Sequence, residues 1–275
     1  MTDGWFLVDT VGDMPAVLLI GARSKQWRPL SNVFRGSVHK TVLRLVDTVL
    51  NNLKQSQVLI DLAGPRLAVA SPVLGTSRQV HGILMWIGEP TRTPPAEPVA
   101  RAWEWELDDR VSPRLVPDRR ATHITTMTQW LSEFARPADA ARVAVDLRTA
   151  EIGLRGTGEW IDLQGTVHRY IYRCIATFDG PRMLVVSVEL PERLSWDDAE
   201  LIARRVTDTT AMTGGIAPAL VHAPTNRVVA WLSTVRPPLP ADVLNGRCPA
   251  PAPTASQPWE GIPDLTLCIF PVGAI

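Results

Sequence analysis

The chain has 275 residues, of which 45% are hydrophobic and 20% are charged, a composition typical of folded domains and unlike that of disordered chains. Its 28 basic and 28 acidic residues give a formal net charge of zero, so no general electrostatic field attracts nucleic acid or an anionic membrane. The three cysteines, Cys174, Cys248 and Cys268, are too scattered for a disulfide framework and include no Cys-x-x-Cys pair.

The N-terminus and the apolar stretches bear on location. The chain starts MTDG, without the basic start and apolar core of an export signal, so we expect a cytoplasmic protein. Residues 14–22 and 83–87 are the longest apolar stretches and fall far short of the roughly 20 residues that span a bilayer. We therefore expect no membrane insertion.

The first segment of the chain reads as a sheet with one helix. Residues 5–10 and 16–20 are β-prone, and residues 67–74 and 80–87 flank a Gly-containing turn, which predicts a hairpin. Residues 38–53 form an amphipathic helix that should pack on this sheet. Its apolar positions are Val38, Val42, Leu45, Val46, Val49 and Leu53.

A Pro-rich stretch, residues 91–100, separates this segment from a second one. Residues 103–107, WEWEL, alternate in a way that predicts a strand with its tryptophans buried and its glutamates in solvent. Apolar residues from 127 to 134 recur at helical spacing, and a second short helix is expected over residues 138–149, after Pro137. Further strands are expected over residues 160–163, 167–176 and 183–190.

The last segment repeats this kind of organisation. Residues 195–210 predict a helix that starts at a serine N-cap, and residues 219–222 and 228–232 predict another hairpin. Residues 236–258 are rich in proline and predict a long loop before a final strand at 265–272.

The fold class predicted from these patterns is α+β, with modules that are antiparallel β-sheets flanked by helices. The expected boundaries are a module at 1–90, a linker at 91–100, a module at 101–192 and a degenerate C-terminal module at 193–275.

Three stretches carry a resemblance to known families. GEWIDLQGTVHRY, residues 158–170, continuing to residues 183–190, looks like the last three strands of a PAS domain. Residues 66–75 and 80–88 are similar to the end of a GAF domain. The opening residues 4–17, GWFLVDTVGDMPAV, resemble the start of an actinobacterial family of three-module PAS/GAF proteins.

What this resemblance implies is signal sensing or protein interaction, with no defined reaction. The first segment has no cysteine for a bilin thioether, and the context of Cys174 is unlike the flavin-reactive motif of light-sensing PAS domains. The Asn-Lys-Phe-Asp-Glu signature of cyclic-nucleotide-binding GAF domains is missing as well. No cofactor is identified, which leaves a small ligand of unknown identity.

Catalytic and metal motifs are not evident in the sequence. The glycine-rich residues 153–158 lack the Lys-Ser/Thr of a phosphate loop, and the five histidines are isolated, without metal-ligand spacing. We therefore predict neither catalytic residues nor a metal site. The basic residues Arg110, Arg114, Arg119 and Arg120 are interrupted by aspartates, so nucleic-acid binding is not expected.

A small-molecule pocket in the second segment is the candidate site. It would lie between helix and sheet, and His123, beside two arginines, is the histidine most suited to a haem or anion role. The candidate lining residues are His123, Trp130, Phe134, Trp160, Tyr170 and Tyr172. These aromatic residues also fit a plain core.

Three functions follow from these features. The first is a non-enzymatic regulatory protein that senses a small ligand or binds a protein partner, with a homodimer among the forms of association. The second is a ligand-free interaction scaffold. The third is an enzyme of unknown class, which requires a cleft where His123 or His168 meets a carboxylate with a perturbed pKa.

Overall fold

The structure is a computed structural model. Its chain forms two compact units. The first contains residues 1–103, 170–172 and 184–191, and the second contains the rest. The residues that the structure describes are 4–11, 15–20, 23–108, 114–116, 126–193, 208, 216–233, 236–259, 262 and 264–272.

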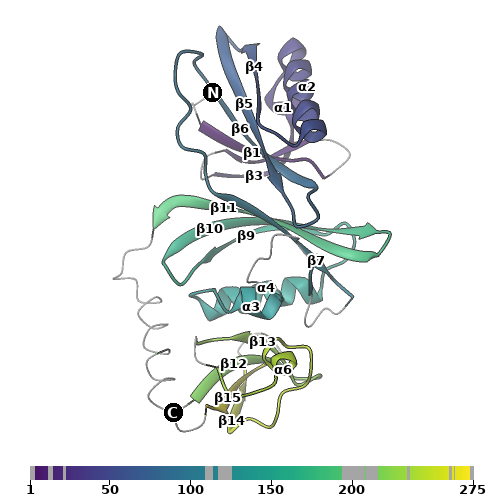
Figure 1. Ribbon diagram of the computed structural model, residues 1–275, viewed down its shortest axis with the longest axis vertical. Coiled ribbons are helices and arrows are strands. Elements are labelled where there is room, and N and C mark those ends of the chain that lie inside the picture. The colour runs from purple at the N-terminus through teal and green to yellow at the C-terminus, as the bar shows by residue number, and fades with distance from the viewer. Residues whose placement is uncertain are drawn as a thin grey trace. The chain divides into compact units, whose positions relative to one another are not determined.

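A six-stranded sheet forms the body of the first unit (Figure 1). Its strand order is β3-β2-β1-β6-β5-β4, and the neighbouring strands pair in antiparallel fashion. The hairpin predicted for the first segment is confirmed as β5 and β6. The strands are β1 (Gly4–Asp9), β2 (Ala16–Ile20), β3 (Arg23–Pro29), β4 (Ser56–Asp61), β5 (Pro65–Leu74) and β6 (Val80–Gly88).

One face of this sheet is covered by α2 (Gly36–Asn52), which follows the single turn α1 (Leu30–Val33). The helix lies along β4, β5 and β6, as Figure 1 shows. Four apolar side chains of the helix are buried against the sheet: Val42, Leu45, Val46 and Val49. Burial of each contributes about 1.5–3 kcal/mol to the free energy of folding. The helix ends at Leu53, which takes a left-handed conformation with φ 55°. The predicted amphipathic helix is thus confirmed.

The other face of the sheet is buried as well. Trp5, Leu84 and Trp86 belong to a second core cluster, together with Ile171 and Val186 of the same unit. Burial on both faces explains why nearly every position of β6 is apolar rather than every second one.

The Pro-rich stretch before β7 (Ala100–Glu106) is tied to the first unit. The indole N–H of Trp5 donates to the carbonyl of Pro95 over 3.3 Å, and the Ser71 hydroxyl donates to the Glu97 carboxylate over 2.8 Å. This segment, expected as a linker, has irregular backbone but definite contacts with the sheet.

A five-stranded sheet with the order β8-β7-β11-β10-β9 follows. It contains strands near the positions predicted for the second segment, although β9 begins at Arg155, five residues before the predicted strand at 160–163. Two helices precede β9 in the chain, α3 (Met127–Leu131) and α4 (Pro137–Arg148). A capping box starts α3, where Thr126 and Gln129 exchange hydrogen bonds of 3.2 Å. The remaining strands are β8 (Arg114–Leu115), β9 (Arg155–Ile161), β10 (Thr166–Thr177) and β11 (Gly180–Arg193).

A four-stranded sheet with the order β13-β12-β15-β14 completes the second unit. Its hairpin of β12 and β13 confirms the one predicted for the last segment. The predicted helix at 195–210 lies outside the described residues apart from Asp208. The elements are β12 (Ile216–His222), β13 (Arg227–Trp231), α6 (Ala241–Leu244), β14 (Ala255–Pro258) and β15 (Leu265–Pro271).

The edge strand β13 forms hydrogen bonds with side chains of α3 and of the residue that follows it. The Thr128 hydroxyl donates to the Val228 carbonyl over 3.3 Å, and the backbone N–H of Trp231 donates to the Ser132 hydroxyl over 3.0 Å. Side-chain hydroxyls therefore take the place of a further strand at this edge.

Together the three sheets confirm a mixed α and β fold whose sheets are mostly antiparallel. The identity of the modules as PAS or GAF domains stays a prediction.

Candidate functional site

Three of the predicted pocket residues, Trp130, Phe134 and Trp160, gather in the second unit. They come from α3, the turn after it, and β9. Trp130 lies edge-on to Phe134, with centroids 5.1 Å apart, and edge-on to Trp160 at 6.0 Å. Trp105 of β7 stacks on Trp130 at 5.8 Å. We call these four residues, together with His168, the aromatic cluster.

Within this cluster, Trp160 is the middle ring of a three-ring stack. The Phe134 ring stacks on the Trp160 ring at a centroid distance of 4.5 Å and an interplanar angle of 13°. His168 stacks on Trp160 at 4.2 Å and 11°. All three residues are buried, so the stack is part of the core of the unit.

The imidazole of His168 also meets a carboxylate. Its Nε2 lies 3.0 Å from Asp162 Oδ2, and the other carboxylate oxygen accepts the backbone N–H groups of Gln164 at 2.9 Å and Thr166 at 2.8 Å. Burial alone would raise the pKa of Asp162, but the hydrogen bonds from His168 and from these backbone groups lower it below its usual value. The carboxylate therefore stays ionised while it anchors the turn between β9 and β10.

Two indole groups of the cluster have no hydrogen-bond acceptor among the described residues. The Nε1 atoms of Trp105 and Trp160 are both buried there without one. The residues themselves are 0% and 4% exposed. A buried N–H without a partner costs about 1–3 kcal/mol, and most buried polar groups are satisfied. Two such donors in one cluster mark it as unusual.

The other predicted pocket residues fall elsewhere. Tyr170 and Tyr172 are buried on β10, stack on each other at 6.2 Å and belong to the first unit. His123 lies outside the described residues. Sequence reasoning left Trp105 and His168 out of the site, although the two-residue period of β10 places His168 on the same strand face as Tyr170.

One expectation about this region is wrong. Glu104, expected on a solvated strand face, is 1% exposed, because both faces of β7 are covered at residues 102–105. Its carboxylate lies 3.4 Å from Nη1 of Arg182 on β11, which compensates the buried charge.

The glycine-rich stretch and the serine noted in the sequence have structural roles. Gly153, at φ 90°, precedes β9, so this stretch leads into a strand rather than a helix N-terminus. Ser71 is buried and bonded to Gln55 and Glu97. Arg236, at the start of the Pro-rich loop, lies over the Trp231 ring at 5.6 Å.

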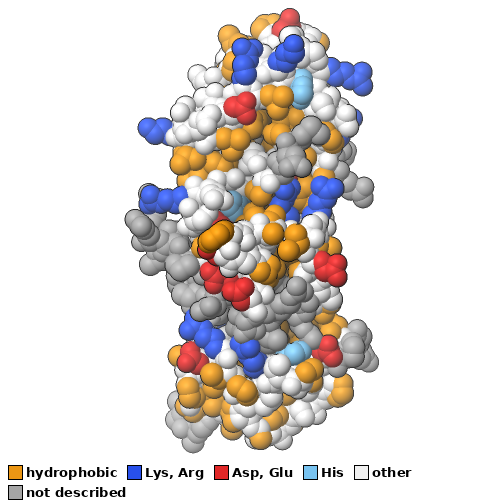
Figure 2. Space-filling model, turned by 90° about the vertical axis from the view of Figure 1, so that its right-hand side faces the viewer, with side chains coloured by type: hydrophobic (Ala, Val, Ile, Leu, Met, Phe, Trp, Pro, Cys, Tyr) orange, Lys and Arg blue, Asp and Glu red, His pale blue; other side chains and the backbone are white. Residues whose placement is uncertain are grey.

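Metal-ligating side chains are dispersed in the described part of the chain. There, no group of three or more His, Cys, Asp or Glu side chains lies together in a way that could hold a metal ion. On the face drawn in Figure 2, Lys and Arg side chains of the described residues are dispersed among neutral and hydrophobic ones. No described helix combines the length and apolar character needed to cross a membrane.

The fold defines a class of mixed α and β proteins built on antiparallel sheets, and a solved structure shares it. The chain is similar to the crystal structure of an uncharacterised protein from Mycobacterium tuberculosis, with a TM-score of 0.66 and 19% sequence identity. The match covers 99% of this chain and 97% of that one, so it extends over the whole fold.

A family model matches the N-terminal part. Residues 4–96 match the family described as Rv3651-like, N-terminal. The predicted likeness to an actinobacterial family is therefore supported at this level, without its PAS or GAF identity. No curated protein matches the chain.

A weaker structural match is the periplasmic sensory domain of the chemoreceptor Tlp1 of Campylobacter jejuni. It has 10% identity and a TM-score of 0.21, and it covers 70% of this chain and 73% of that one. Such a TM-score is too low to indicate a shared fold.

Proposed function

We propose that the protein is a non-enzymatic regulatory protein whose aromatic cluster binds a small ligand carrying hydrogen-bond acceptors. The observation that carries this proposal is the pair of buried indole donors, on Trp105 and Trp160, that meet no acceptor in the part of the chain that the structure describes. A ligand that accepts from them would recover part of about 1–3 kcal/mol for each donor.

The surroundings of these donors define the ligand chemistry. The neighbouring rings of Trp130, Phe134 and His168 offer apolar and aromatic surface, which favours a flat, largely apolar molecule. Carbonyl or ether oxygens suit the indole N–H groups, since these groups only donate. A free carboxylate is less suitable, because the ionised Asp162 bonds to His168 in the same cluster.

The Asp162–His168 pair bears on the enzyme alternative. It brings a histidine against a carboxylate with a lowered pKa, which is one requirement of that alternative. However, the carboxylate accepts hydrogen bonds from two backbone N–H groups of the turn, and the imidazole stacks against the Trp160 ring. These contacts favour a structural role for the pair, and we propose no reaction.

A ligand-free scaffold is the second candidate. It is supported by the packing of Trp160, which is stacked against both Phe134 and His168 and so resembles a filled core. In this case the two indole donors are a tolerated cost of packing large rings.

Native mass spectrometry and absorbance of freshly purified full-length protein test the proposal. We expect a non-covalently bound molecule, and we expect Trp105→Phe and Trp160→Phe to reduce the bound fraction because each removes a donor but keeps a ring. The loss of one such hydrogen bond corresponds to a roughly 5-fold or larger change in affinity.

Trp86→Phe is the matched control, since Trp86 is also fully buried with an unpartnered Nε1 but lies in the first unit. It should retain the ligand. Repeated preparations without any bound molecule would favour the scaffold, and equal loss in all three variants would place the ligand elsewhere.

A further inference from the structure

The hairpin tip between β10 and β11 exposes a large aromatic side chain. Phe178 is 105% exposed, whereas the next most exposed large hydrophobic residues among those described, Ile152 and Leu59, reach 65% and 63%. A phenylalanine left in water forgoes about 1.5–3 kcal/mol of burial. Single exposed apolar residues are common, so exposure alone does not define a site.

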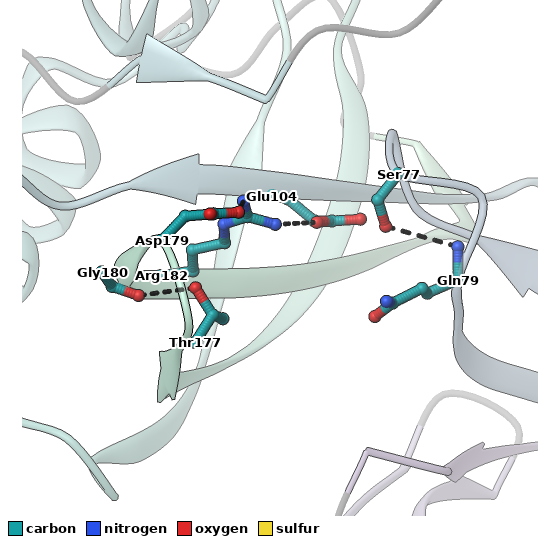
Figure 3. A network of polar contacts seen from close by, with 7 residues as sticks. All are labelled: Ser77, Gln79, Glu104, Thr177, Asp179, Gly180 and Arg182. Atoms are coloured by element: carbon teal, nitrogen blue, oxygen red, sulfur yellow. Dashed lines mark hydrogen bonds and ion pairs between the residues drawn. The ribbon is translucent and has the colours of Figure 1, made fainter.

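The backbone of this tip is held in a fixed shape. The Thr177 hydroxyl donates to the carbonyl of Gly180 over 2.7 Å, which closes the turn around Phe178. Gly180 has φ 120°, and a Cβ there would lie 2.9 Å from Asp108 Oδ1, so the turn requires glycine. Figure 3 shows Thr177 and Gly180 with the hydrogen bond between them.

A charge network that reaches from the interior to the surface supports the same tip. Arg182 lies between two carboxylates, with Nη2 3.0 Å from Asp179 Oδ2 and Nη1 3.4 Å from Glu104 Oε2 (Figure 3). The Glu104 side chain is 2% exposed and the Arg182 side chain 17% exposed. A tip anchored to a buried ion pair loses little conformational freedom on binding, which favours affinity.

Among the described residues, the solvent-facing charge at the tip is acidic. The Asp179 side chain is 69% exposed, and Asp108, beside Gly180, is also exposed. Arg182, which lies largely inside, is already paired with two carboxylates. An acidic rim disfavours an anionic membrane surface and favours a partner with positive charge.

Further apolar surface lies along the same hairpin. The backbone of Gly153 and Leu154 bonds to Cys174 of β10 at 2.8 Å, and Ile152 and Leu154 are exposed there. Cys174 precedes Phe178 by four positions, which is about 13 Å along an extended strand. These residues and Phe178 all belong to the second unit.

We propose that this tip docks on another protein, with Phe178 entering an apolar pocket that is ringed by Arg or Lys side chains. An exposed aromatic anchor on a rigid support, surrounded by charge, is the arrangement that concentrates binding energy in protein interfaces. The inference concerns a different surface from the aromatic cluster and does not depend on a ligand there.

A photo-crosslinking residue placed at position 178 of the full chain, in the native host, tests this docking. The control carries the same residue at position 59, because Leu59 is a similarly exposed apolar residue in the first unit. We expect one protein to be captured from position 178 and not from position 59. That protein is then purified and its affinity measured for the wild type, Phe178→Ala and Leu59→Ala.

Phe178→Ala should weaken binding about 10-fold or more, while Leu59→Ala leaves it unchanged. Asp179→Asn should weaken it less, and the remaining affinity should depend less on salt. Since Phe178 is fully exposed, its removal should leave the melting temperature unchanged.

Three results would overturn the docking proposal. One is that the purified partner binds Phe178→Ala as tightly as the wild type. Another is flotation of the wild type, but not of Phe178→Ala, with vesicles of phosphatidylglycerol. The third is a Phe178-dependent dimer in sedimentation, which would assign the tip to a second copy.

Discussion

Replacing Ser132 by alanine should destabilise the second unit because a buried backbone N–H group loses its acceptor. The Ser132 hydroxyl donates to the Thr128 carbonyl over 2.7 Å and accepts the backbone N–H of Trp231 over 3.0 Å. Ser132 is 6% exposed and Trp231 is 1% exposed, so water cannot readily replace the lost acceptor. The Thr128 carbonyl keeps its bond from the backbone N–H of Ser132 at 3.1 Å.

The cost should therefore include that of the Trp231 N–H, about 1–3 kcal/mol for a buried donor that loses its acceptor. Urea unfolding followed by tryptophan fluorescence measures the free energy of unfolding, and the exposed Ser256 on β14 provides the control Ser256→Ala, which should change it by less than about 0.5 kcal/mol. If Ser132→Ala were as stable as this control, the hydroxyl would not be what satisfies the β13 edge.

The other predictions concern a carboxylate and a glycine. The lowered pKa of Asp162 means that its contribution to stability is fully present above its unfolded-state pKa of about 4 and is lost as the pH falls through the folded-state pKa. Asp162→Asn should lower the free energy of unfolding at neutral pH and reduce the decrease of that free energy on acidification, because the amide does not titrate. Urea unfolding at a series of pH values measures both effects. An unchanged pH profile would contradict the assigned hydrogen bond from His168. Gly246→Ala should lower the melting temperature more than Gly153→Ala, because both have positive φ, 68° and 90°, but only at Gly246 would a Cβ lie 2.1 Å from the Val228 carbonyl oxygen. Equal shifts in calorimetry would show that backbone strain, and not this close approach, decides the cost.

The interior strands of the fold could be predicted from the sequence, whereas the edge strands β3 and β4 could not. Strands β1 and β6 are buried on both faces, so their sequences are continuous apolar runs that are easily distinguished from loops. The edge strand β4 alternates between exposed and half-buried positions, and β3, with the sequence RSKQWRP, is mostly polar. Such segments form strands because a neighbouring strand supplies hydrogen bonds, a cause that local sequence does not contain.

The same limit explains the outcome at the candidate site. Trp130, Phe134 and Trp160 could be selected because large aromatic residues at helical and strand spacing favour a core. The stacking of His168 on Trp160 depends on the turn at Asp162, which folds β10 back along β9. That turn follows from its own chemistry, an aspartate that accepts two backbone N–H groups ahead of Gly165 at φ 83°.

Glu104 shows the opposite case, in which a local pattern led to the wrong environment. Alternation in WEWEL correctly separates the two faces of β7, but it cannot say that both faces are covered. What makes a buried glutamate tolerable is Arg182, which lies 78 positions further along the chain. Because the same guanidinium also holds Asp179 at the hairpin tip, the residue that compensates a charge in the interior also sets the shape of the exposed surface around Phe178.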